Sequence, residues 1–323
     1  MTAAVRGPIP FVVPGYENDP ERPLNPWSPP PRARSTAHDG YYCQVGGLRE
    51  AYGQLAGDGG WLDGLCGHAG CLILVNGPPR SGKTSLVYRC AQWATLGEQP
   101  EHEVNVIDVI GVAGRNQSIS ERTAQVAKRL QLKLQQITIP PGLRAYVDKN
   151  EDFDKILPAL GEIHLATKQR VWFVLLLPPL DPDPDVAMTE LCCYGRAITA
   201  GVVCIAESSL ATPLRPAGPH ETISLDLRYL EACEADTLVA QWPNSNAFRP
   251  IIAAGALAEV QTSAGANGLP LTAGRLLSAL RQVHFQRLSG NPTPAALNSI
   301  RSSEIVDVLL GCFAPGGQGT VHS

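Results

Sequence analysis

A short segment of the chain combines glycines with a lysine and a threonine at fixed spacing. Residues Gly77 to Thr84 read Gly-Pro-Pro-Arg-Ser-Gly-Lys-Thr, which fits the pattern G-x-x-x-x-G-K-[ST]. Glycines let the backbone curl so that successive N–H groups point at phosphate oxygens. We expect Lys83 to place its charge between two phosphates and the Thr84 hydroxyl to bind Mg²⁺. The segment therefore predicts a nucleoside triphosphate site.

The flanking sequence supplies the elements that such a loop needs. Cys71–Asn76 is an apolar run typical of a buried strand, and residues 83–96 have the pattern of a helix. The start of that helix adds the positive end of its dipole to the phosphate site. The strand and the helix stand where the motif requires them, so a chance match is a poor explanation. The predicted phosphate-binding residues are Gly77, Pro78, Pro79, Arg80, Ser81, Gly82, Lys83, Thr84 and Ser85.

The choice of nucleotide depends on a second motif. GTPases usually carry an Asn-Lys-x-Asp segment that reads guanine, and this tetrapeptide does not occur in the sequence. ATP with Mg²⁺ is therefore the expected cofactor, and dATP or another triphosphate is the alternative.

Short apolar strands alternate with helical stretches around the loop, which predicts an α/β fold. We expect a three-layer domain with a mainly parallel five-stranded sheet, followed by a small helical lid. The predicted strands are Cys71–Asn76, Val104–Val109, Val171–Leu177, Val202–Ala206 and Thr222–Leu225. The predicted helices of this domain are 83–96, 119–132, 152–166 and 187–199. Those of the lid are 227–240, 247–262, 271–287 and 294–310.

Composition shifts divide the chain further. Residues 1–40 are dense in proline and predict an extended or disordered arm, with Phe11, Tyr16 and Trp27 available to pin it to a surface. The expected domains are then 41–225 for nucleotide binding and 226–312 for the lid. Residues 313–323 are glycine-rich and predict a flexible tail.

This layout resembles the ATPases of the AAA+ and STAND groups, including the NB-ARC-like and origin-recognition-like proteins. Val45 and Gly46 lie in Gln-Val-Gly-Gly-Leu-Arg-Glu, which is similar to an element whose backbone touches adenine in these families. Pro270, in Gly-Leu-Pro-Leu, resembles the proline that packs on the base in NB-ARC domains; a plain helix start is the alternative.

The same resemblance implies roles for three more side chains. Ser208, after the predicted fourth strand, would be the sensor that faces the γ-phosphate, or would simply begin a loop. Arg275 would be the lid arginine, and Arg196 an arginine finger that acts on a neighbouring subunit. A solvent-facing arginine is the alternative at both positions.

The sequence departs from this group where the third strand ends. A Walker B strand ends in an Asp that holds Mg²⁺, often followed by an acid that activates water. Here Pro178 and Pro179 occupy those places. Either Asp181 bends back to take the metal role, or the site has lost part of its machinery. Asp108 and Glu207 are possible substitutes, because both should lie at the carboxyl edge of the sheet; a loop acid or a cap is the alternative at each position. We therefore expect ATP binding with slow or absent hydrolysis.

Bulk composition narrows the function classes. The formal net charge is −4, which is not the basic footprint of a nucleic-acid binder. The sequence contains neither a run long and apolar enough for a membrane span nor the apolar core of a signal peptide. Arginine-rich, lysine-poor composition hints at a bacterial genome. Nine cysteines without a CxxC pair indicate reduced thiols and a cytoplasmic location. Cys66, His68 and Cys71 have metal-ligand types, but a fourth ligand for zinc is not apparent.

Three functions fit these observations. The first is a nucleotide-dependent switch or ATPase that acts through protein partners or self-assembly. The second is a small-molecule phosphotransferase, although its arginine-rich lid is not evident in residues 226–312. The third is an interaction protein that binds ATP without hydrolysing it, as the two prolines after the third strand favour.

Overall fold

The computed structural model describes most of the chain and divides it into two compact units. The α/β unit comprises residues 50–77 and 83–226, and the helical unit comprises residues 1–49, 78–82 and 227–323. The described residues are 11–13, 16, 18–26, 40–55, 69–96, 102–114, 117–137, 139, 141–150, 152–166, 170–210, 214, 220–231, 233–243, 252–289 and 300–313.

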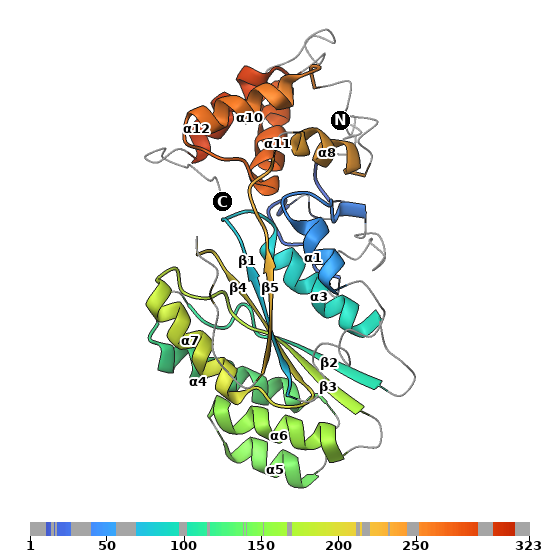
Figure 1. The fold of residues 1–323 in the computed structure, drawn as a ribbon, viewed down its shortest axis with the longest axis vertical. Helices are drawn as coiled ribbons and strands as arrows, with labels where there is room; N and C mark the ends of the chain where they lie inside the picture. Colours follow the sequence, from blue (N-terminus) through green and yellow to red (C-terminus); the bar gives the residue numbers. More distant parts are fainter. Residues whose placement is uncertain are drawn as a thin grey trace, which may run out of the picture. The chain divides into compact units, whose positions relative to one another are not determined.

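The α/β unit is built on a five-stranded sheet in which every paired strand is parallel to its neighbour. The strands follow the order β2-β3-β4-β1-β5 (Figure 1). Their bounds are β1 Cys71–Asn76, β2 His102–Asp108, β3 Arg170–Leu176, β4 Val202–Ser208 and β5 Glu221–Asp226. Asn76 is opposite both Ser208 and Asp226, so β1, β4 and β5 end at one level. The predicted fold class is confirmed.

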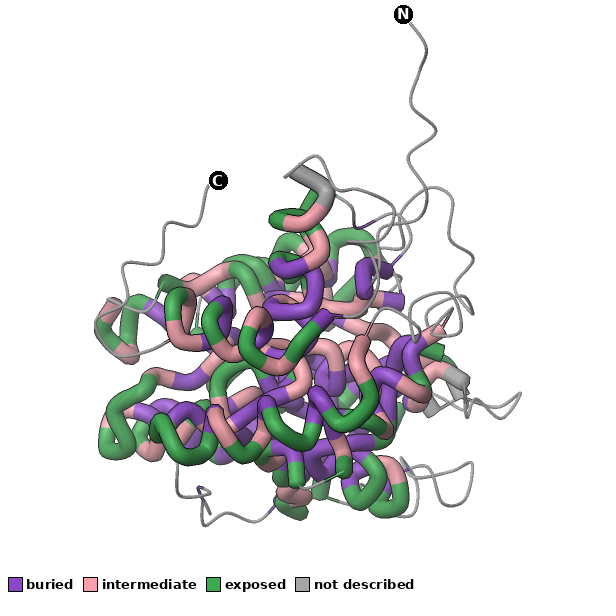
Figure 2. The backbone as a smooth tube through the Cα atoms, turned by 90° about the horizontal axis from the view of Figure 1, so that it is seen from above, coloured by how far each residue is buried: buried purple, intermediate pink, exposed green. Residues whose placement is uncertain are grey.

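Helices cover both faces of this sheet (Figure 1). Leu72 and Leu74 of β1 join the core with the helices that follow β2 and β3, whereas the alternate residues Ile73 and Val75 are buried outside that cluster. Helix α3, which follows β1, packs against the sheet on the face opposite those helices. Every residue of β1 is buried; buried residues are drawn purple in Figure 2. The helices are α1 Leu48–Leu55, α3 Lys83–Leu96, α4 Ile119–Leu134, α5 Pro141–Lys149, α6 Phe153–Ala166 and α7 Pro184–Ala197.

The helical unit has a core of its own. Its helices are α8 Glu234–Gln241, α10 Ala256–Ala266, α11 Ala273–Ser289 and α12 Ser302–Phe313. Phe11 and Tyr16, near the start of the chain, are each 2% exposed and belong to the same apolar cluster as residues of these helices. Trp27 and residues 314–323 lie outside the described part of the chain.

The structure adds helices to the predicted elements and begins several lid helices later than predicted, α10 at Ala256 rather than Ala247 and α12 at Ser302 rather than Pro294. It adds α1 and α5, which are short helices of eight and nine residues. It also begins α8 at Glu234 rather than at Leu227, because Arg228 N and Leu230 N donate to Gly46 O and Leu271 O instead of forming a helical turn.

Candidate nucleotide-binding site

The phosphate loop joins β1 to α3 at the carboxyl edge of the sheet. Gly77 N donates to Ser208 O at 3.1 Å, which ties the beginning of the loop to the end of β4. Gly82 has a φ of 97°, a conformation that favours glycine over every other residue. The helix α3 begins at the next residue, Lys83. The sequence therefore forms the strand–loop–helix arrangement that directs backbone N–H groups toward an anion.

Lys83 is turned into the loop. Its side chain is only 7% exposed, and Nζ donates to Gly77 O at 3.0 Å. Burying an ammonium group is costly unless hydrogen-bond acceptors surround it, and the loop backbone supplies one. The charge of Lys83 is thus held inside the curve of residues 77–83.

Thr84, the second residue of α3, donates its hydroxyl hydrogen bond to Glu207. The distance from Thr84 Oγ1 to Glu207 Oε2 is 2.7 Å. Glu207 lies on β4 opposite Val75 of β1, so the strand register brings it beside the loop. The hydroxyl predicted to bind Mg²⁺ therefore already has a carboxylate partner, and that partner comes from β4.

Two other predicted acids have structural partners. Asp108, at the end of β2, accepts from Tyr88 Oη at 3.1 Å and from Ile110 N at 3.0 Å. Asp181 accepts from Asp183 N at 2.9 Å, and Asp183 in turn caps α7. Asp181 and Asp183, which alternate with prolines in Asp-Pro-Asp-Pro-Asp, thus accept hydrogen bonds from the backbone of the turn that leads into α7.

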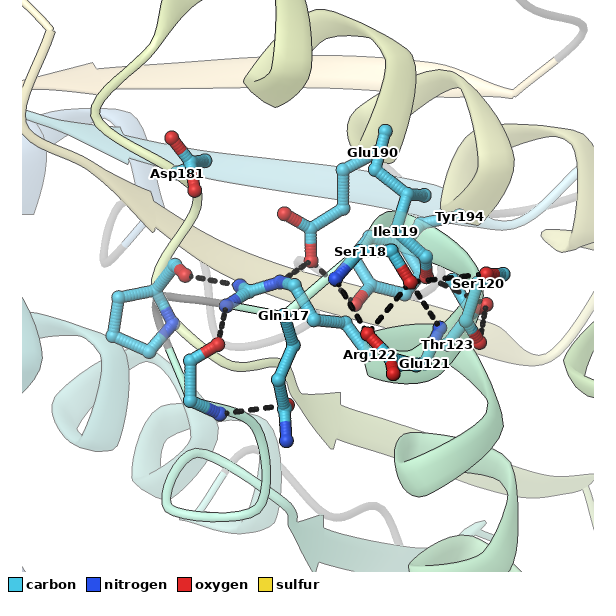
Figure 3. Close-up of polar contacts among 12 residues, drawn as sticks. Gln117, Ser118, Ile119, Ser120, Glu121, Arg122, Thr123, Asp181, Glu190 and Tyr194 are labelled. Atoms are coloured by element: carbon cyan, nitrogen blue, oxygen red, sulfur yellow. Dashed lines mark hydrogen bonds and ion pairs between the residues drawn. The ribbon is translucent and has the colours of Figure 1, made fainter.

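The end of β3 is held by a buried arginine (Figure 3). Arg122 of α4 is 1% exposed, and its Nε donates to Glu190 Oε1 of α7 at 3.0 Å. Its two other guanidinium nitrogens donate to Gly114 O at 2.9 Å and to Pro179 O at 2.7 Å. The Tyr194 hydroxyl adds a bond to Glu190 at 2.8 Å. Burial raises the pKa of Tyr194 well above its usual value, and the neighbouring Glu190 carboxylate adds to the effect.

Sequence reasoning missed this cluster. Arg122 and Glu190 are 68 positions apart, and each lies on a helix where an outward-facing charge is the ordinary reading. One local signal was available, namely the Ser118–Glu121 capping box that places Arg122 in the first turn of α4.

Ser208 and Arg196 occupy different environments. Ser208 is 1% exposed, and its hydroxyl accepts from Leu210 N at 3.2 Å, while its carbonyl receives the Gly77 bond. Arg196 is exposed in the last turn of α7.

The remaining predicted positions belong to the helical unit. Val45 is 2% exposed, and Gly46 pairs with the segment before α8, donating to Glu234 Oε1 at 3.2 Å and accepting from Arg228 N at 2.8 Å. Arg275 Nη1 donates to Pro270 O at 2.8 Å, one turn before it. Arg275 is thus folded back on the start of its own helix.

Arg80 is the part of the phosphate loop that is built into the helical unit. Its φ is 64°, a left-handed conformation that costs a non-glycine residue roughly 1–2 kcal/mol. Arg80 O accepts from Gly274 N at 3.0 Å, and a methyl group on Gly274 would meet that oxygen at 2.6 Å. The guanidinium bonds Glu21 Oε2 at 2.9 Å and stacks 4.8 Å from the Phe313 ring. These contacts hold the unfavourable backbone conformation in place.

The described residues offer neither a metal cluster nor a membrane-spanning helix. They contain no group of three or more His, Cys, Asp or Glu side chains suited to a metal ion. Cys66 and His68 lie outside this part of the chain, whereas Cys71 is buried in β1. Over the same residues, no helix has the length and apolarity to cross a membrane.

Comparisons with known proteins give distant structural similarities. No protein-family model matches the sequence, and no curated protein matches it. PCH-2 from C. elegans is 14% identical at a TM-score of 0.41, covering 74% of this chain and 59% of that chain. The RuvB Holliday junction branch migration motor from Thermotoga maritima is 14% identical at 0.42, covering 85% and 72%. A STAND protein with a tetratricopeptide repeat sensor from Pyrococcus horikoshii is 16% identical at 0.42, covering 72% and 29%.

Proposed function

We propose that this chain binds ATP with Mg²⁺ through the loop Gly77 to Thr84 and acts as a nucleotide-dependent switch of the AAA+/STAND kind. The observation that carries the proposal is the position of Lys83. Its ammonium group is buried on Gly77 O at 3.0 Å, in a loop that opens α3 at the carboxyl edge of a parallel sheet. This is the position from which a lysine reaches phosphate oxygens.

The residues of the loop would divide the work of binding. Lys83 would exchange Gly77 O for oxygens of two phosphates, and the backbone N–H groups of residues 80–84 would surround them. The Thr84 hydroxyl would hold Mg²⁺, which neutralises charge on the phosphates when bound. Both Lys83 and Thr84 lie on the first turn of α3, so one rigid element would position them together.

Slow hydrolysis is part of the proposal. Pro178 and Pro179 stand after β3 where an ATPase of this group would carry its acids, and proline can neither bind a metal through its side chain nor polarise water. The Pro179 carbonyl is bonded to Arg122 at 2.7 Å, which favours a fixed loop over one that swings an acid into the site.

A switch also needs an element that responds to the nucleotide. Arg80 is a candidate because its strained backbone is secured by Gly274, Glu21 and Phe313. A loop that tightens around phosphates would disturb these contacts inside the helical unit. Protein partners that distinguish the arrangement with the Arg80 contacts intact from the arrangement with them disturbed would then transmit the signal.

Equilibrium titration with ATP in a Mg²⁺ buffer tests the binding claim. We expect Lys83→Ala to weaken binding on the order of 100-fold or more, because hydrogen bonds to charged groups contribute about 1.5–3 kcal/mol each. Lys128→Ala, an exposed lysine on α4, is the matched control and should bind like the wild type. Equal affinities for wild type and Lys83→Ala would overturn the proposed function.

A further inference from the structure

The carboxylate beside Thr84 is the feature that the proposed function leaves unexplained. Glu207 is half-buried near the end of β4, and its Oε2 accepts the Thr84 hydroxyl hydrogen bond at 2.7 Å. In phosphate-loop proteins an acid near this hydroxyl helps to hold Mg²⁺, and that acid is expected after the third strand. Here the third strand is followed by Pro178 and Pro179.

The other acids at the carboxyl edge are engaged elsewhere. Asp108 bonds Tyr88 and its own loop backbone, and Asp181 bonds the backbone of Asp183. Asp226, at the end of β5, accepts from Asn76 Nδ2 and Ser224 Oγ, both at 2.9 Å. Among these described acids, Glu207 is the one with a hydrogen bond to Thr84.

The sheet explains how β4 can supply this group. β4 is the immediate neighbour of β1, whereas β3 lies one strand farther away. Val75 is paired with Glu207, and Gly77 N is bonded to Ser208 O at 3.1 Å. The backbone of β4 is therefore fixed to the beginning of the phosphate loop, and Glu207 has a side chain long enough to reach Thr84 on the helix that follows.

We propose that Glu207 takes the place of the missing Walker B acid and holds Mg²⁺, together with Thr84, directly or through a metal-bound water. Carboxylate and hydroxyl oxygens are the hard ligands that Mg²⁺ prefers, and Mg²⁺ commonly keeps several waters that need such acceptors. In the structure Glu207 accepts a hydrogen bond from the Thr84 hydroxyl, so the two oxygens already lie close together. The inference rests on the proposed binding of ATP at this loop.

The role assigned to Glu207 is binding and not proton abstraction. A carboxylate committed to the metal stabilises the Mg²⁺–ATP complex without activating an attacking water. The arrangement therefore agrees with tight Mg²⁺-dependent binding and slow hydrolysis together.

The experiment measures ATP affinity twice for each protein, in Mg²⁺ and in EDTA, by calorimetric titration. The dissociation constant in EDTA divided by that in Mg²⁺, called the Mg²⁺/EDTA ratio of affinities, reports how much the metal strengthens binding. Loss of an outer metal partner typically weakens metal affinity 10- to 100-fold, so we expect Glu207→Gln to lower this ratio by about tenfold or more. Affinity in EDTA should stay within about twofold of wild type, because Gln still accepts the Thr84 hydrogen bond.

Glu221→Gln is the matched control, since Glu221 is exposed at the opposite end of β5. Its Mg²⁺/EDTA ratio should equal that of the wild type. An unchanged ratio in Glu207→Gln would overturn the inference while leaving the proposed function intact. If Glu207→Gln lowered the melting temperature but left the ratio unchanged, Glu207 would be a structural partner of Thr84, and the inference would again be overturned. Failure of the wild type to bind ATP in either buffer would overturn both.

Discussion

The carboxyl ends of β3 and β4 lie side by side in the sheet but are built from opposite kinds of residue. β3 runs into two prolines, and the second has its carbonyl bonded to the buried Arg122 at 2.7 Å. β4 runs into Glu207 and Ser208, which contact the phosphate loop through Thr84 and Gly77. One end is fixed by a buried ion pair, whereas the other presents a half-buried carboxylate.

Under the proposed function, the difference would let a site without an acid after β3 take its metal partner from β4. The Arg122–Glu190 pair is sealed from solvent, so its charges serve packing and loop position. Glu207 is hydrogen-bonded to a hydroxyl on the phosphate-loop helix, so its carboxylate lies beside a residue proposed to bind the ligand. The contacts at the β3 end are structural, and ligand binding at the β4 end is the role proposed for Glu207.

The largest expected effect tests the structural assignment. Glu190→Ala should lower the free energy of unfolding by about 3–5 kcal/mol, because it leaves the Arg122 guanidinium buried without its carboxylate. Urea denaturation followed by circular dichroism measures this loss. Glu162→Ala, an exposed glutamate on α6, should change stability little. A loss below about 1 kcal/mol in Glu190→Ala would mean that this end of the sheet tolerates an unpaired charge.

The smallest expected effect tests whether Asp181 shares the metal role. Because its carboxylate accepts from Asp183 N in the turn before α7, we expect Asp181→Asn to change the Mg²⁺/EDTA ratio of ATP affinities by less than about twofold, against about tenfold for Glu207→Gln. The same calorimetric titrations compare the two variants directly. A fall in Asp181→Asn that equals the fall in Glu207→Gln would contradict the division between the two strand ends.

The sequence predicted the parts of the molecule that depend on neighbouring residues. The bounds of β1 and α3 agree with the prediction, since an apolar run, a glycine-rich loop and a helical pattern follow one another without interruption. The short helix α5 was not predicted because Pro140 and Pro141 suggest a turn, although proline suits the first position of a helix.

The parts that could not be predicted depend on contacts between distant residues. Glu207 was one of three candidate acids, and only the register of β4 beside β1 distinguishes it from Asp108 and Asp181. Arg122 was not a candidate, because its partners Glu190 and Pro179 come from later elements. The capping box of α4 places Arg122 in the first turn, but the partners that hold its side chain inward are distant in sequence.

A single-turnover experiment tests the central claim most directly. Wild-type protein in excess over radiolabelled ATP and Mg²⁺ is quenched at intervals, and bound ATP and released phosphate are measured in the same samples. The account predicts that ATP is bound and converted no faster than about 10⁻³ s⁻¹, the scale of unassisted hydrolysis on a phosphate loop. Conversion at about 1 s⁻¹ or faster, or no retention of ATP at all, would contradict it.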